Sequence, residues 1–123
     1  MDEHITLLNQ TILKTLEKCP WTKNQNYPDL IKSVKDELSE VIEALNKDDN
    51  DNFEEEIGDL LFTVLLLGHV AEKDNKISFR KSIDRVNNKI IKRSPHVFGD
   101  KEAKTPEEAL EIWNSIKYKD YTV

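Results

Sequence analysis

Four acidic residues share a spacing that can build a metal site. Glu37 and Glu40 are three residues apart, and Glu56 and Asp59 repeat that spacing after a short polar segment. Residues three apart lie on one helix face, so two such helices packed antiparallel would bring the pairs together. Converging carboxylates repel one another unless hard divalent cations neutralise them, and Mg²⁺ is the first candidate for such a cation. Acidic pairs are also common on solvated helix faces, and spacing alone leaves both interpretations open.

The residues beside Asp59 favour a site. Asp59 directly precedes an apolar run that begins at Leu60, and it follows Gly58. A glycine inside a helix costs about 1 kcal/mol relative to alanine. A structural reason for a glycine at position 58 is therefore expected, such as the close approach of another backbone.

Basic and aromatic residues follow at helical spacing further along the chain. Lys89 and Arg93 are four residues apart, with Arg85 one turn earlier, and Trp113 and Lys117 are also four apart. Cations beside a carboxylate–metal cluster suit a polyphosphate, which needs both metal and positive side chains. The competing interpretation is that these cations only balance the charge of an acidic protein.

Five segments must position these side chains. Apolar residues recur at spacings of three and four, without a strand period, which predicts an all-α fold: a bundle of about five helices. The apolar stripes span residues 5–16, 31–45, 60–70, 79–90 and the segment that begins at the capping-box pattern of Thr105. Residues 47–52 are polar and predict a short connection between the second and third helices.

The third predicted helix is apolar on nearly every side over residues 60–70. One neighbouring layer cannot cover such a helix, so it should lie inside a bundle, in a subunit interface, or both. A symmetric dimer through this helix is the economical solution.

The composition of the chain limits its domain number, its partners and its location. The chain has 123 residues, 18 Lys+Arg against 24 Asp+Glu, a net charge of −6 and one cysteine. We expect a single domain over residues 1–123, without an internal disulfide framework. The excess of acid argues against binding a nucleic-acid polymer. The uncharged stretch at 60–71 is shorter than the roughly 20 residues that span a bilayer, and the acidic start is no secretory signal, so we expect a cytoplasmic protein without a membrane partner.

Taken in order, the motifs resemble one enzyme family. They are Cys19-Pro20-Trp21 with Gln25, Asp36-Glu37-x-x-Glu40, Glu56-x-x-Asp59, and KIIKRSPHVFG at residues 89–99. Together they resemble the MazG family of nucleoside triphosphate pyrophosphohydrolases, which belongs to the all-α NTP pyrophosphatase group. The resemblance runs from about Cys19 to Lys117.

The resemblance implies a Mg²⁺-dependent hydrolase, with Mn²⁺ as a substitute. It would cut a (d)NTP between its α- and β-phosphates, giving a nucleoside monophosphate and pyrophosphate in nucleotide-pool house-cleaning. The metal-ligand and catalytic positions carry over to Glu37, Glu40, Glu56 and Asp59. The phosphate- and nucleotide-binding positions carry over to Lys89, Arg93, Trp113 and Lys117. The family also implies a homodimer or a higher homo-oligomer.

Three departures from the family pattern keep alternatives open. Asp36 replaces a usual glutamate, Thr22 a usual aspartate and Ser94 a common histidine. The chain could be a non-catalytic helical binding or assembly module of the same fold. It could also be a relative restricted to dUTP or dCTP, or one acting on phosphoribosyl-ATP, although KIIKRSPHVFG favours the MazG branch.

The remaining aromatic, histidine and cysteine residues give weaker signals. Either Trp21 or Trp113 could stack on a base, but core packing is favoured for Trp21 and is equally weighted for Trp113. His69 lies in the apolar helix and is expected to be a hydrogen-bonded core or interface residue. Cys19 has no histidine at a nucleophile spacing, so a structural role is expected.

Overall fold

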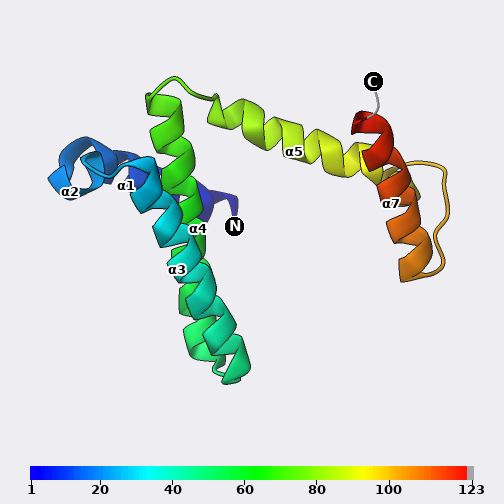
Figure 1. Ribbon diagram of the computed structural model, residues 1–123, viewed down its shortest axis with the longest axis horizontal. Coiled ribbons are helices and arrows are strands. Elements are labelled where there is room, and N and C mark those ends of the chain that lie inside the picture. The colour runs from blue at the N-terminus through cyan, green and yellow to red at the C-terminus, as the bar shows by residue number, and fades with distance from the viewer. Residues whose placement is uncertain (122–123) are drawn as a thin grey trace. The chain divides into compact units, whose positions relative to one another are not determined.

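The structure, a computed structural model, describes residues 1–121, and every regular element in that range is a helix (Figure 1). The elements are α1 (Asp2–Lys18), α2 (Pro20–Lys23), α3 (Tyr27–Asn46), α4 (Asn50–Lys73), α5 (Phe79–Arg93), α6 (Pro95–Phe98) and α7 (Pro106–Tyr121). The all-α prediction is confirmed, and the five long helices match the five predicted ones. The sequence pattern missed the short helices α2 and α6, which each begin at a proline that suits a first helical turn.

Two compact units divide the chain. The first unit is Met1–Phe79 and holds α1 to α4, and the second is Arg80–Val123 and holds α6, α7 and nearly all of α5. Within residues 1–121, no helix combines the length and the apolar character that crossing a membrane requires.

The centre of the first unit is a hairpin of α3 and α4, which lie side by side in Figure 1. The predicted polar connection is present and links the two helices through residues 47–49. Asp48 has a φ of 53°, a left-handed conformation that aspartate tolerates better than most residues. The Asp49 carboxylate accepts a hydrogen bond from the Asn52 backbone N–H at 3.2 Å and caps the start of α4. The link therefore sets how α4 faces α3.

The far end of the hairpin, away from this link, holds the apolar core. Ile12 and Leu16 of α1 pack with Leu30 of α3 and with Leu66 and Val70 of α4. The side chains of Ile12 and Leu30 are each only 1% exposed. Burial of these groups anchors α1 against the hairpin by the hydrophobic effect.

A close approach occurs at one glycine of α4, but not at the predicted one. A Cβ atom built on Gly58 would meet nothing within 4 Å, so the prediction that another backbone approaches Gly58 is wrong. At Gly68, by contrast, a Cβ would lie 2.5 Å from ring atoms of Phe79. The missing side chain of Gly68 makes room for that ring, which also meets His69 edge-on at a centroid distance of 5.1 Å.

The all-round apolar stretch of α4 is only partly covered. Leu66 and Val70 face the core, whereas Leu61, Phe62 and Val64 are 37%, 38% and 44% exposed. The chain thus buries one side of this helix and leaves an apolar side open.

In the second unit, α6 packs against α7. The predicted capping motif starts α7: the Thr105 hydroxyl oxygen accepts a hydrogen bond from the Glu108 N–H at 3.1 Å. The Glu108 carboxylate accepts from the N–H of Lys104, one residue before the position that the usual capping box would use, at 2.8 Å.

Candidate active site

The two acidic pairs meet in the middle of the hairpin. Glu40 and Glu56 are each eight residues from Asp48, and Glu37 and Asp59 are each eleven residues from it. In an antiparallel hairpin, residues at equal distances from the link lie at the same level. Oxygen atoms of Glu37, Glu56 and Asp59 all lie within 4.8 Å of one another. The Glu40 carboxyl group lies within hydrogen-bonding reach of Glu37 and Glu56.

The carboxylates of this cluster repel one another when no cation is bound. Contact with the Glu40 carboxyl, followed by burial and contact with Glu37, raises the pKa of Glu56 to about 7. Burial first, and then the Glu40 carboxyl, raises the pKa of Glu37. These directions are those expected when like charges share a partly desolvated space.

The cluster fits a hard divalent cation. One oxygen of Glu37 and one of Glu56 are buried without a hydrogen-bond partner, so the fold presents lone pairs that no protein donor uses. Every available donor atom is a carboxylate oxygen, the ligand type that Mg²⁺ and Mn²⁺ prefer. Glu37, Glu56 and Asp59 can hold such an ion directly, and Glu40 adjoins them.

Asp36 lies outside this cluster. Its carboxylate accepts a hydrogen bond from the Lys32 ammonium group at 2.9 Å, and both side chains are largely exposed. The replacement of a glutamate by Asp36 therefore leaves the four clustered carboxylates in place.

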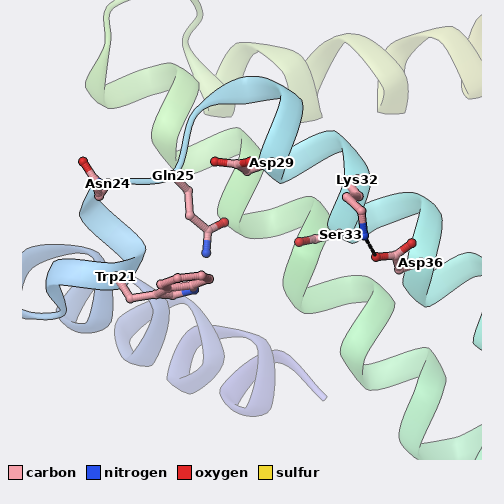
Figure 2. Close-up of a pocket in the computed structure, with 7 residues that line it drawn as sticks. All are labelled: Trp21, Asn24, Gln25, Asp29, Lys32, Ser33 and Asp36. Atoms are coloured by element: carbon pink, nitrogen blue, oxygen red, sulfur yellow. Dashed lines mark hydrogen bonds and ion pairs between the residues drawn. The ribbon is translucent and has the colours of Figure 1, made fainter.

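Asp36 instead borders a cavity of about 350 Å³ at the start of α3. Figure 2 shows the Trp21 ring beside the Gln25 side chain at this cavity. Trp21 is 77% exposed, so the expectation of core packing is wrong for it. Ser33 also borders the cavity and lies one helical turn, about 6 Å, along α3 from Glu37.

A second, smaller cavity of about 160 Å³ shares Trp21, Gln25 and Ser33 with the first. Its other walls include the apolar side chains of Leu30 and Phe62. The two cavities together offer a polar entrance, an aromatic face and an apolar wall on the first unit.

The basic and aromatic residues predicted to bind phosphate and nucleotide all lie in the second unit. Lys89 is exposed and Lys117 is half-buried. The structure brings Arg93 and Trp113 together, with the guanidinium carbon 5.6 Å from the centroid of the indole ring. Arg93 is buried, and one of its terminal nitrogens lies 3.4 Å from the Asp120 carboxylate.

Sequence reasoning missed Asp120. Its spacing carried a usable signal, because Trp113, Lys117 and Asp120 are separated by four and three residues and share one face of α7.

His69 and Cys19, for which the sequence predicts structural roles, both lie in the first unit. His69 is half-buried and its Nε2 lies 2.9 Å from the Asn9 side-chain oxygen, so the expected hydrogen bond is present. Cys19 occupies the N-cap position of α2, and hydrogen bonding to Thr22 lowers the pKa of its thiol.

Comparison with known proteins relates this geometry to a family. Residues 25–98 match the MazG nucleotide pyrophosphohydrolase domain. The chain is 33% identical over 99 residues to a nucleoside triphosphate pyrophosphohydrolase of Escherichia coli (strain K12), covering 80% of this chain and 38% of that protein. It is 32% identical over 105 residues to a nucleoside triphosphate pyrophosphohydrolase/pyrophosphatase MazG of Thermotoga maritima, covering 85% of this chain and 40% of that protein. The chain thus spans about two fifths of the length of these curated relatives.

A solved structure resembles the chain over nearly its full length. The crystal structure of a mazG-related protein from Thermotoga maritima superimposes with a TM-score of 0.83 at 37% sequence identity. The match covers 92% of this chain and 98% of that one.

Proposed function

The chain belongs to the MazG family, and on that premise we propose that it hydrolyses nucleoside triphosphates between the α- and β-phosphates. Water adds to a phosphorus atom, the bridging P–O bond breaks, and a nucleoside monophosphate and pyrophosphate result. The proposed domain covers residues 1–123, since the family match at 25–98 runs through both compact units. A cytoplasmic location follows from the proposed substrate.

The convergence of the acidic pairs is the observation that carries this proposal. The chain buries Glu56 to 8% exposure beside other carboxylates and leaves an oxygen of Glu56 and of Glu37 without a donor. Such an arrangement works against folding unless a cation compensates for it. A protein that needed only an acidic surface would leave these groups in water.

Mg²⁺, with Mn²⁺ as a substitute, is the proposed cofactor, held by Glu37, Glu40, Glu56 and Asp59. When bound, such an ion activates water and stabilises negative charge on phosphate oxygens. Glu37, Glu40, Glu56 and Asp59 would hold the ion in their deprotonated form, and the unpartnered buried oxygens of Glu37 and Glu56 would be available to it as ligands. Lys89, Arg93 and Lys117 are proposed to donate hydrogen bonds to phosphate oxygens and to offset their charge.

The nucleoside end of the substrate is proposed to lie in the cavity beside Trp21. The exposed indole face offers stacking that every base can use, which predicts broad base tolerance. Trp113 remains the other stacking candidate, although its ring already faces Arg93.

We also propose that the protein works as a homodimer or a higher homo-oligomer. Two apolar stripes on α3 and α4, each with spacings of four and three, are exposed at between 37% and 53%: Leu38, Ile42 and Leu45 on α3, and Ile57, Leu61 and Val64 on α4. A second copy of the same surface would cover them by two-fold symmetry.

Pyrophosphate release from a panel of NTPs and dNTPs, with Mg²⁺ and with EDTA, tests the proposed reaction. We expect metal-dependent release together with the matching monophosphate, and a loss of about a hundred-fold or more in kcat for Asp59→Asn and Glu56→Gln. Glu43→Gln is the matched control, because Glu43 lies on α3 just beyond Glu40 and is an exposed partner of Lys47. Absence of release from every triphosphate would refute the proposal and favour a binding module.

A further inference from the structure

Asp120 joins two cations at the junction of α5 and α7. Its carboxylate accepts hydrogen bonds from the Lys92 ammonium group at 2.5 Å and from the Arg93 guanidinium at 3.4 Å. Only a quarter of the Asp120 side chain is exposed, and these contacts, led by the one with Lys92, lower its pKa. Asp120 is therefore an ionised, partly buried acceptor.

Arg93 depends on its surroundings for orientation. Its side chain is 6% exposed, and its Nε atom is buried without a hydrogen-bond partner. The guanidinium group lies over the Trp113 ring on one side and reaches Asp120 with a single terminal nitrogen. A buried guanidinium with so few contacts keeps donors free for an anionic ligand, provided that something holds its plane in place.

Asp120, Lys92 and Arg93 together carry a net positive charge. Asp120 carries one negative charge against the two positive charges of Lys92 and Arg93, and its shorter contact is with Lys92. Asp120 can thus orient Arg93 without cancelling the attraction of Arg93 for phosphate.

We propose that Asp120 is a positioning residue that holds the guanidinium of Arg93 over the Trp113 ring for binding the triphosphate. This inference rests on the proposed function, because it assigns Arg93 to the substrate's phosphates. Asp120 acts through Arg93, which is assigned to the phosphates, so its effect falls on substrate binding rather than on the chemical step.

The kinetic test compares three variants of the full chain. Asp120→Asn should raise KM for the triphosphate by about five-fold while kcat stays within two-fold. The substitution weakens the contact that holds the Arg93 guanidinium in place for the phosphates. Asp120→Glu keeps the charge and should stay near the wild-type KM. Glu111→Gln removes the same charge from an exposed position of α7 and should leave KM unchanged. An unchanged or lowered KM in Asp120→Asn, or an equal rise in Asp120→Glu, would overturn the proposal.

A spectroscopic test separates this inference from the proposed function. The chain has two tryptophans, so Trp21→Phe leaves Trp113 as the only indole fluorophore. In that background Asp120→Asn should shift the Trp113 emission to the red and speed its quenching by acrylamide, because Arg93 no longer shields the ring. Unchanged emission means that Asp120 does not position Arg93, whether or not the protein hydrolyses triphosphates.

A double-mutant comparison completes the separation. Arg93→Met keeps the bulk of the side chain, and in that background Asp120→Asn should have no further effect on KM. If Arg93→Met itself leaves KM unchanged, Arg93 does not bind substrate and the proposal fails, even where the emission shift is seen. If the wild-type protein releases no pyrophosphate at all, the proposed reaction fails, and the emission test alone decides the positioning by Asp120.

Discussion

Metal binding should release protons from the carboxylate cluster, by an amount that depends steeply on pH. Glu56 has a pKa of about 7 without a cation, against an ordinary value of 4.5. On that value, the carboxyl carries about 0.9 proton at pH 6, about 0.5 at pH 7 and about 0.1 at pH 8. A divalent ion needs the deprotonated form, so these fractions are released when it binds.

The same titration of Glu56 sets the apparent affinity of the protein for the metal ion. Competition between proton and cation at Glu56 makes the ion bind about ten-fold more weakly at pH 6 than at pH 8. The direction in which folding stability changes with pH follows from the same pKa. The folded-state pKa is raised, so the metal-free protein loses stability as pH rises from about 4.5 to about 7, and added Mg²⁺ restores it.

Isothermal titration calorimetry with MgCl₂, in two buffers of different ionisation enthalpy, counts the protons released. Glu56→Gln should reduce the release at pH 6 and weaken its pH dependence. Asp36→Asn is the control, because Asp36 pairs with Lys32 outside the cluster and should leave the proton count unchanged. Release that does not vary between pH 6 and pH 8, or that persists fully in Glu56→Gln, would refute the reasoning.

Four further substitutions test the fold and the assembly. Gly68→Ala should destabilise the protein by about 1–3 kcal/mol in urea unfolding, because its Cβ would meet the Phe79 ring at 2.5 Å. Gly58→Ala, with open space at the same kind of helical site, should instead stabilise it by about 0.4–1 kcal/mol. Leu30→Ala should cost about 2–5 kcal/mol, since this side chain is 1% exposed in the core. Leu61→Glu should shift the protein toward monomer in sedimentation velocity without unfolding it, and an unchanged oligomeric state would exclude that apolar side of α4 as the interface.

Much of the fold could be predicted because the helical signals are local. Apolar spacing, the Thr105 cap and the polar segment at 47–52 each act within one or two turns, and the structure contains the corresponding elements. The carboxylate cluster was predictable for the same reason: a short link forces α3 and α4 to pack antiparallel. Counting outward from Asp48 would have paired Glu40 with Glu56 directly.

What could not be predicted depends on contacts between distant residues. Gly58 and Gly68 are both helical glycines, and only the position of Phe79 shows which of them makes room for a neighbour. Trp21 has the apolar character of a core residue, but the proline-initiated turn of α2 presents it to solvent. The pairing of Asp120 with Arg93 joins residues 27 positions apart, beyond the range of any helical spacing rule.

The placement of all four carboxylates on one hairpin has a consequence for how such proteins can change. Residues 37–59 form a local segment whose contacts are made across a three-residue link, so the proposed metal site is encoded in a short, continuous stretch of the gene. The residues proposed to grip the triphosphate are encoded separately, downstream of Phe79. Mutation or recombination can then alter the proposed phosphate-binding residues while the hairpin with the proposed metal site is inherited intact. An insertion within residues 47–49 has the opposite effect, because each added residue turns α4 by about 100° and separates the two acidic pairs.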